Sequence, residues 1–356
     1  MTDVFDLNGI IVEKYPDHVS GKEGILSFTS THEEYEALKD GVGIRNISDR
    51  NVIALYGKDV LEFLNRLSTN KIVDMPTAGI KGTIFTNEKG RIIDRTVLVG
   101  LEGKHLLISS CSCDTRILSW IEKYIVMDDI RTEMVGGQYC MLEFYGRQAE
   151  SYLTMFCGNS IEQVNDSNLT LITHEDVHFF LFKQVEPSGL EKFMLLSPVS
   201  YGKKIIDILL NNTSAFNVLF VGSDAYSRFR IENGIPAYPN ELNDSYNPHE
   251  ANLLCEVNLN KGCYIGQEVI ARLDTYDKVQ RNLTGIVSNL PLNGETDLLN
   301  DSGEVVGIIT SHFDLKESDK TIGLAYIRKA FNVSEQELIV AGTDNRIIVK
   351  KLPIVL

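Results

Sequence analysis

The chain has 356 residues, of which 43% are hydrophobic and 23% charged, and its formal net charge is −15. This length exceeds what one hydrophobic core usually supports, so two or three domains are expected in an ordinary globular protein. The negative charge disfavours a nucleic-acid partner, because it repels phosphate backbones. No apolar run approaches the roughly 20 residues that span a bilayer, and the acidic start lacks the features of a signal or transit peptide, so we expect a cytoplasmic protein without a membrane partner.

The cysteines and histidines indicate neither a disulfide framework nor a metal centre. Six cysteines are spread over the whole length, and Cys111 and Cys113 flank one serine without a second pair nearby. Of the seven histidines, His174 and His178 have HExxH spacing, but this run falls at the turn between two predicted strands and not on a helix, where the motif would place both histidines on one face. We therefore expect free thiols and no metal site.

The first part of the chain combines β-rich runs with amphipathic helices. Residues 51–56 predict a strand that Gly57 ends, and apolar residues at helical spacing predict a helix over about 58–68. The turn at 87–90 lies between two β-rich runs and predicts a hairpin. Further elements are expected as strands at 83–87, 91–99, 104–109 and 139–144, and as helices over 117–125 and 148–156.

The same pattern then recurs. Strands are predicted at 169–173, 177–184 and 192–196, followed by helices over 203–210 and 223–233. Ser223 is a suitable N-cap for the last helix, and Gly234 and Pro236 end it. Hairpins grouped with helices, twice over, predict an α+β fold of two similar antiparallel units with a boundary near residue 145. A doubly wound parallel sheet is not expected.

The character of the sequence changes near Asp277. Five short β runs follow, at 281–287, 305–310, 321–326, 337–340 and 346–352. They predict a small all-β barrel or sandwich. We therefore expect an α+β domain over 1–277 and a β-barrel domain over 278–356.

One cysteine lies in a pattern that favours chemistry. Cys263 stands between Gly262 and Tyr264, immediately before a predicted helix and two residues after Lys261. Backbone N–H groups at a helix start and a nearby cation favour the thiolate, so the sulfur could react or hold a ligand. The alternative is a small buried hydrophobe in a glycine-rich turn.

The neighbours of Cys263 suggest how its loop is built. Glu268 and Arg272 lie four residues apart, which favours a structural ion pair on one helix face. Gly262 and Gly266 are expected to provide backbone freedom. Lys261 and Gln267 are expected to orient whatever meets the sulfur. Cys255 is expected in the core, with a resolving role left open.

Several segments are similar to those of one known family. The early strand–Gly–helix segment 57–64 and the barrel runs 305–311 and 322–327 fit it. So do Arg-Ile-Glu-Asn-Gly-Ile-Pro at 230–236, Pro-His-Glu-Ala-Asn-Leu at 248–253, and Lys-Gly-Cys-Tyr with Gly-Gln-Glu and Arg over 261–272. With these segments the chain resembles the glycine cleavage T-protein (aminomethyltransferase) superfamily, and the cysteine pattern resembles its YgfZ-type branch.

The resemblance implies a cloverleaf of two ferredoxin-like α+β units and a C-terminal barrel around a tetrahydrofolate pocket. It also implies a role with iron–sulfur enzymes or their assembly factors. Glu191 lies where the superfamily carries its pterin-binding loop, and Arg230, Lys261 and Arg272 would provide cations for the folate. The alternatives are a solvated turn glutamate for Glu191 and an intramolecular ion pair for Arg230.

Asp94 departs from the superfamily pattern. Aminomethyltransferases carry an Asp-Asp pair that handles charge at the transferred carbon, whereas this chain has Asp94 followed by Arg95. A neighbouring cation would make Asp94 a weaker proton acceptor. The resemblance therefore favours a tetrahydrofolate-binding protein that assists iron–sulfur cluster assembly or repair through Cys263. The alternatives are a tetrahydrofolate-dependent aminomethyltransferase or methyltransferase, with Asp94 as the second catalytic candidate, and a scaffold whose folate pocket has decayed.

Overall fold

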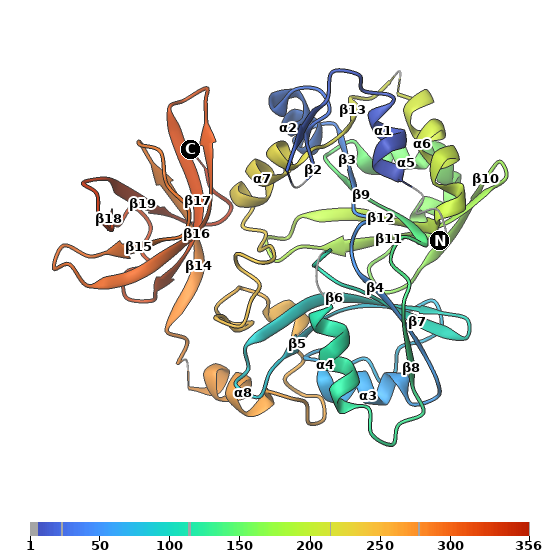
Figure 1. The fold of residues 1–356 in the computed structure, drawn as a ribbon, viewed down its shortest axis with the longest axis horizontal. Helices are drawn as coiled ribbons and strands as arrows, with labels where there is room; N and C mark the ends of the chain where they lie inside the picture. The colour runs from blue at the N-terminus through green and yellow to red at the C-terminus, as the bar shows by residue number, and fades with distance from the viewer. Residues whose placement is uncertain (1–5, 23, 113–114, 214, 277, 356) are drawn as a thin grey trace. The chain divides into compact units, whose positions relative to one another are not determined.

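The computed structural model describes residues 6–22, 24–112, 115–213, 215–276 and 278–355 (Figure 1). The chain folds into two compact units. The first unit comprises Met1–Val60, Met75–Lys81 and Val97–Phe229, and the second comprises Leu61–Asp74, Gly82–Thr96 and Arg230–Leu356. Each unit is described by itself below.

A six-stranded sheet forms the centre of the first unit. Its strand order is β10-β11-β12-β9-β3-β13, and only the short pair of β13 and β3 runs parallel. The strands are β3 (Val42–Asn46), β9 (Tyr139–Tyr145), β10 (Thr170–His174), β11 (Val177–Val185), β12 (Glu191–Pro198) and β13 (Val218–Phe220). The antiparallel hairpins agree with the prediction.

Helices cover one face of this sheet, because their apolar stripes and the strand side chains share one core. That core joins α1 (Leu7–Val12), α5 (Ala149–Cys157) and α6 (Gly202–Asn211) to strands β3, β9, β11 and β12. The first unit also contains the helix α2 (Thr31–Lys39) and the hairpin of β1 (Val19–Gly21) and β2 (Gly24–Ser27).

The other face of the six-stranded sheet packs on a second sheet. The buried residues between them come from β9, β11 and β12 on one side and from β4, β6 and β7 on the other. This second sheet has the order β5-β6-β7-β4-β8. Its strands are β4 (Val52–Tyr56), β5 (Ile80–Thr86), β6 (Ile92–Leu101), β7 (Lys104–Ile108) and β8 (Arg131–Met134). Residues 82–86 of β5 and 92–96 of β6 are assigned to the second unit, and the helix α4 (Arg116–Tyr124) belongs to the first.

The second unit contains a closed barrel of six antiparallel strands (Figure 1). They are β14 (Arg281–Ser288), β15 (Thr296–Leu299), β16 (Val305–Leu315), β17 (Lys320–Arg328), β18 (Glu337–Val340) and β19 (Arg346–Lys350). Alternate side chains fill the barrel interior, as a closed sheet requires.

Helices that precede the barrel in the chain also belong to the second unit. They are α3 (Val60–Leu67) from its second residue onward, the last three residues of α7 (Ser223–Glu232), and α8 (Gln267–Thr275). The thiol motif of the sequence lies immediately before α8.

The predicted α+β class with a C-terminal β-barrel is confirmed. The strands that were not predicted include β15, whose four residues lie between turns, and β3. The predicted boundary near residue 145 falls at the end of β9, inside the six-stranded sheet, because β3 from the early chain pairs with β9. Asp277 lies outside the described residues, between the end of α8 and the start of β14.

No helix within the described part of the chain is both long and apolar enough to cross a membrane.

Candidate functional site

Cys263 lies on an exposed loop of the second unit. We use the name thiol loop for residues Lys261–Gly266, which precede α8. Gly262 and Cys263 are exposed, whereas Lys261 and Tyr264 on either side of them are 8% and 7% exposed. The expectation that the helix starts next to the thiol is corrected, because α8 begins only at Gln267, four residues after Cys263. The loop therefore displays the sulfur at a short tip between two buried anchors.

The first anchor is the ammonium group of Lys261. Its Nζ donates to the backbone carbonyls of Asn65, Ser68 and Asn70 at 2.6, 2.7 and 2.7 Å. These carbonyls lie at and just beyond the C-terminal end of α3, where helix carbonyls lack intrahelical partners. All three N–H groups of the ammonium are thus used inside the protein. Burial lowers the pKa of Lys261 to about 7.

Residues on both sides of Cys263 are also bonded to the end of α3 and to nearby segments. The Ile265 amide donates to the carbonyl of Arg66 at 3.1 Å, and Thr86 Oγ1 donates to the Ile265 carbonyl at 2.7 Å. Earlier in the segment, Thr69 Oγ1 donates to the carbonyl of Glu256 at 2.8 Å. The chain is therefore fixed before and after Cys263 by hydrogen bonds to α3 and to residues that follow α3 in the sequence.

The two glycines of the loop differ in their roles. Gly266 has a φ of +86°, and a Cβ there would lie 2.6 Å from the carbonyl oxygen of Asn87 and 2.7 Å from Thr86 Oγ1. Only glycine fits this left-handed position without strain. Gly262 has no left-handed φ, and a Cβ there would meet nothing within 4 Å. The expected need for glycine holds at Gly266 alone.

Two buried polar atoms near the thiol loop have no hydrogen-bond partner in the described structure. They are Glu256 Oε2 and the hydroxyl of Tyr264, which come before and after Cys263 in the chain. Glu256 uses its other oxygen, Oε1, to accept from Arg95 Nη2 at 2.6 Å and from Arg95 Nε at 2.8 Å. A buried polar group without a partner costs about 1–3 kcal/mol, so the packing beside the thiol loop carries a local cost in stability.

The cysteines separate into exposed and buried groups. Cys255 lies in a 3₁₀ turn (Leu254–Glu256) and is exposed, so the expectation of a core position is corrected. Cys111, Cys140 and Cys157 are buried. Burial raises the pKa of Cys140 and of Cys157 to about 12, which makes them poor nucleophiles. Cys113 lies outside the described residues.

Arg230 forms the intramolecular ion pair that is the alternative to a folate contact. Its Nη1 donates to Glu241 Oε2 at 3.1 Å, and its Nη2 donates to Ser311 Oγ at 2.7 Å. Glu241 is completely buried, and its Oε1 also accepts from Thr310 Oγ1 and Ser311 Oγ at 2.6 and 2.7 Å. This network ties the end of α7 to strand β16.

Arg272 lies on the exposed side of α8. Its Nη2 is 3.0 Å from Glu268 Oε1, so the predicted ion pair between residues four apart is confirmed. Both side chains are largely exposed, and such pairs contribute only a few tenths of a kcal/mol.

The two carboxylates predicted for folate lie in different units. Asp94 is on β6 in the second unit and is 5% exposed. Its neighbour Arg95 donates to Glu256 Oε1 through both Nε and Nη2, so the charge of Arg95 is largely compensated there. Glu191 begins β12 in the first unit, and its side chain is 60% exposed, with Lys183 Nζ 3.9 Å from its Oε2. Its carboxylate can therefore accept further hydrogen bonds.

The first unit contains a buried charge cluster that sequence reasoning missed. We define it as Arg45, Arg50, Glu143, Glu186 and Lys192. Lys192 Nζ lies 2.9 Å from Glu143 Oε1 and 2.7 Å from Glu186 Oε1, and Arg45 and Arg50 approach the Glu143 carboxylate at 3.0 and 3.4 Å. The one signal in the sequence was Glu143 itself, a charged residue inside the apolar strand β9.

The charges in this cluster stabilise one another. Burial alone would raise the pKa of Glu143, but the charges of Lys192, Arg50 and Arg45 hold it well below its usual range. Burial would likewise lower the pKa of Lys192, but Glu143 and Glu186 raise it above its ordinary value. Glu143 and Lys192 are therefore both ionised at neutral pH.

Within the described ranges, no group of three or more His, Cys, Asp or Glu side chains is arranged to hold a metal ion.

Comparison with known proteins identifies the family. The model of the GCVT N-terminal domain matches residues 12–261. The chain belongs to this family. It is 28% identical over 345 residues to a chloroplastic protein of Arabidopsis thaliana that is named as a transferase, covering 93% of this chain and 76% of that protein. It is 24% identical over 323 residues to an aminomethyltransferase of Staphylococcus carnosus (strain TM300), covering 88% and 86%.

A solved structure supports the fold of this family member. The crystal structure of the glycine cleavage system aminomethyltransferase T from Bartonella henselae matches with a TM-score of 0.80 and 19% sequence identity, covering 96% of this chain and 95% of that one. At this identity the match shows a shared fold. The GCVT assignment thus agrees with the observed α+β sheets and C-terminal barrel.

Proposed function

We propose that this GCVT-family protein binds tetrahydrofolate and assists iron–sulfur cluster assembly or repair, with Cys263 in a redox or transient-ligand role. The partners would be iron–sulfur enzymes or their assembly factors. This assignment follows the YgfZ-type cysteine pattern over residues 261–272, which lies within the family resemblance.

The observation that carries the proposal is the construction of the thiol loop. Cys263 is exposed at the tip, while Lys261 uses three hydrogen bonds to fix the loop in place. A cysteine that served only as a small hydrophobe would be buried, as Cys140 and Cys157 are. The thiol is thus presented to a partner.

The residues fit a folate in part. Glu191 has an accessible carboxylate that can accept from the amino and N–H groups of the pterin edge. Lys261 and Arg230 have their donors committed inside the protein, so we do not assign them to the folate. Arg272 remains exposed and accessible beside Glu268. When bound, tetrahydrofolate can carry a one-carbon unit, and whether it does so here is part of the test.

The deciding experiment compares folate binding and cellular function in matched cysteine variants. Calorimetry with tetrahydrofolate under anaerobic conditions is done on the wild type, Cys263→Ala, Cys255→Ala and Glu191→Gln. The same variants are tested for rescue of a strain whose iron–sulfur enzymes fail without this protein. Cys255→Ala is the control, because it removes an exposed thiol from the same unit.

The expected result is that Cys263→Ala keeps wild-type folate affinity and loses rescue, whereas Cys255→Ala keeps both. Glu191→Gln should weaken folate binding by about tenfold, since it removes a charged acceptor. Full rescue by Cys263→Ala would remove the role given to the thiol. Absence of folate binding by the wild type would favour a scaffold with a decayed pocket.

A folate-dependent aminomethyltransferase is the second candidate. Two of the similar proteins are named aminomethyltransferases, and Asp94 is retained at the corresponding segment. This function requires formation of methylene-tetrahydrofolate from an aminomethyl-lipoyl carrier protein. The assay is run on folate-competent protein with Asp94→Asn as control, and no turnover in the wild type would eliminate this candidate.

A further inference from the structure

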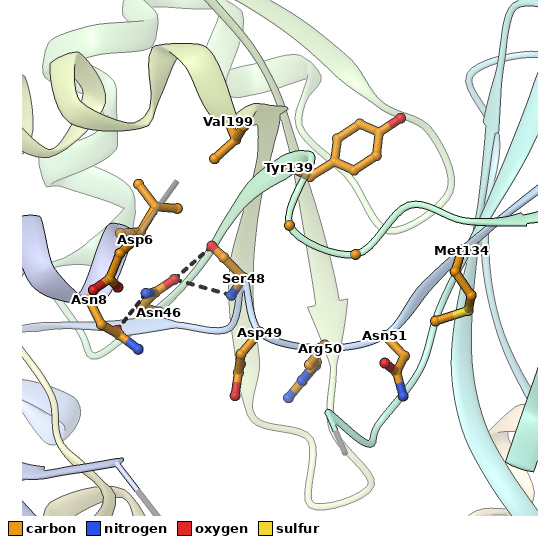
Figure 2. Close-up of a pocket in the computed structure, with 13 residues that line it drawn as sticks. Asp6, Asn8, Asn46, Ser48, Asp49, Arg50, Asn51, Met134, Tyr139 and Val199 are labelled. Atoms are coloured by element: carbon orange, nitrogen blue, oxygen red, sulfur yellow. Dashed lines mark hydrogen bonds between the residues drawn. The ribbon is translucent and has the colours of Figure 1, made fainter. Parts of the chain in front are cut away.

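A cavity of about 600 Å³ lies in the first unit, at the loop that joins β3 to β4. This volume falls within the usual range for small-molecule sites. Its lining includes Asn46, Asp49, Arg50, Asn51 and Tyr139 (Figure 2). All of its lining residues belong to the first unit, so the cavity is complete without the second.

Arg50 brings unused hydrogen-bond donors to this cavity. Its side chain is only 18% exposed, and its ion pair with Glu143 is long, with 3.4 Å between Arg50 Nη1 and Glu143 Oε1. A guanidinium carries five N–H donors, and one long contact cannot satisfy them. By contrast, Arg45 makes a 3.0 Å hydrogen bond to Glu143 Oε2 and lies 3.8 Å from the ring centre of Tyr226. Arg50 is therefore the cation of the cluster with capacity for another partner.

The charge balance of the cluster favours an anionic group at Arg50. Its five members are three cations (Arg45, Arg50 and Lys192) and two carboxylates (Glu143 and Glu186). Glu143 is completely buried, and three cations surround it at 2.9–3.4 Å. A buried cation is stable only when it is paired. A carboxylate in the cavity would supply the matching charge and a planar bidentate partner.

The cavity also presents negative charge beside Arg50. Asp49 is exposed and forms no ion pair within the described part of the chain, and Figure 2 shows the Asp49, Arg50 and Asn51 side chains on the same side of the loop. A simple anion would be repelled by this carboxylate. A ligand with both an ammonium and a carboxylate would match both charges.

The wall of the cavity is already fixed before a ligand arrives. Asn46 Oδ1 accepts from the amide and the hydroxyl of Ser48 at 3.1 and 2.7 Å, and Asn46 Nδ2 donates to Asn8 Oδ1 at 2.8 Å. Ser48 Oγ also accepts from the Met141 amide at 2.8 Å. These bonds hold the β3–β4 loop in one conformation, so little ordering is needed on binding.

We propose that this cavity binds a small amino acid as its zwitterion, with the carboxylate on Arg50 and the ammonium beside Asp49. The proposal does not depend on folate binding or on Cys263, because neither Glu191 nor Cys263 lines the cavity.

The test measures binding of defined probes. Glycine, β-alanine and γ-aminobutyrate are compared with acetate and ethylammonium by calorimetry and by NMR saturation transfer. The proteins are the wild type, Arg50→Gln, Arg50→Lys and Asp49→Asn, and Arg147→Gln serves as the matched control, because Arg147 is an exposed arginine of the same unit. The amino acid that binds most tightly indicates the distance between the charges of Arg50 and Asp49, because the series varies the distance between ammonium and carboxylate.

At least one amino acid should bind more tightly than acetate and ethylammonium. Arg50→Gln should weaken that binding by about tenfold or more, and Arg50→Lys should weaken it by less. Asp49→Asn should weaken the binding of the amino acid but not the binding of acetate. Arg147→Gln should bind as the wild type does. If Arg50→Gln does not fold, Arg50→Lys and Asp49→Asn still decide the outcome. The proposal is overturned by no amino-acid binding at about 10 mM, by undiminished binding in Arg50→Gln, or by acetate binding as tightly as every amino acid.

Discussion

Lys192 in the first unit and Lys261 in the second are both buried, at 6% and 8% exposed, but their surroundings differ. Two carboxylates, those of Glu143 and Glu186, lie 2.9 and 2.7 Å from the Lys192 ammonium. Three neutral carbonyls surround the Lys261 ammonium. The pKa values follow this difference, because the carboxylates raise that of Lys192 above its ordinary value and burial lowers that of Lys261 to about 7.

The comparison shows that a buried lysine can serve two purposes. Carboxylates compensate its charge fully, so Lys192 contributes to the stability of the sheet that contains it. Carbonyls satisfy its hydrogen bonds but supply no opposite charge, so burying the Lys261 ammonium costs free energy. What Lys261 contributes in return is the position of the residues around it. That benefit is the fixed conformation of the thiol loop.

Lys192→Met should produce the largest loss of stability. The substitution removes the short contacts to Glu143 and Glu186 and leaves their buried carboxylates with fewer cations. Breaking a buried ion pair from one side costs about 3–5 kcal/mol, and we expect a loss of this size in the free energy of unfolding. Urea denaturation measures it.

The control for this variant is Lys204→Met in the same unit. Lys204 pairs with Glu175 and Asp176 at the surface, where ion pairs contribute about 0–1 kcal/mol. Equal losses in Lys192→Met and Lys204→Met would show that the buried cluster does not stabilise the unit.

Lys261→Met should have a smaller effect on stability and a local effect on the thiol loop. It removes three hydrogen bonds but also removes the buried charge, so we expect a loss of about 1–3 kcal/mol. The Ile265 amide, which donates to Arg66, should lose protection against hydrogen exchange. Lys351→Met, at an exposed lysine of the same unit, is the control. Unchanged exchange at Ile265 would contradict the positional role of Lys261.

Much of the fold could be predicted from sequence because it follows from local patterns. The α3 helix, the β11–β12 hairpin and most of the barrel strands have apolar periodicity bounded by turn residues. The pairing of β3 with β9 could not be predicted in this way, because these strands lie about 100 residues apart and short strands carry weak signals. Local patterns therefore indicate which helices and strands form more reliably than they indicate which strands pair in one sheet.

The candidate site was predictable only in part, for a physical reason. The motif around Cys263 marked the correct loop, and the Glu268–Arg272 pair followed from helix spacing. The three carbonyls that hold Lys261 are backbone atoms, which leave no trace in residue identity. The Arg230–Glu241 pair depends on Ser311 of β16, which bonds to both residues and lies about 70–80 residues away in the chain. Such contacts between distant segments require the folded structure.

The pH dependence of stability gives the last prediction. The folded pKa of Lys261 is about 7, below the unfolded value of 10.5. Between these values the unfolded chain holds more protons than the folded protein, so the free energy of unfolding rises with pH, by at most ~1.4 kcal/mol per pH unit. Lys261→Met lacks this contribution. The stability difference between the wild type and Lys261→Met should therefore grow in favour of the wild type from about pH 7 to pH 10.

Lys192 provides the opposite case in the same measurement. Its folded pKa is raised above 10.5, so its stabilisation is complete below that pH and is lost only as the pH rises through the folded value. The difference between the wild type and Lys192→Met should stay constant across the window in which the Lys261 difference grows. If both differences stay constant, the three carbonyls keep Lys261 charged throughout, and carbonyl dipoles alone compensate a buried ammonium as well as carboxylates do.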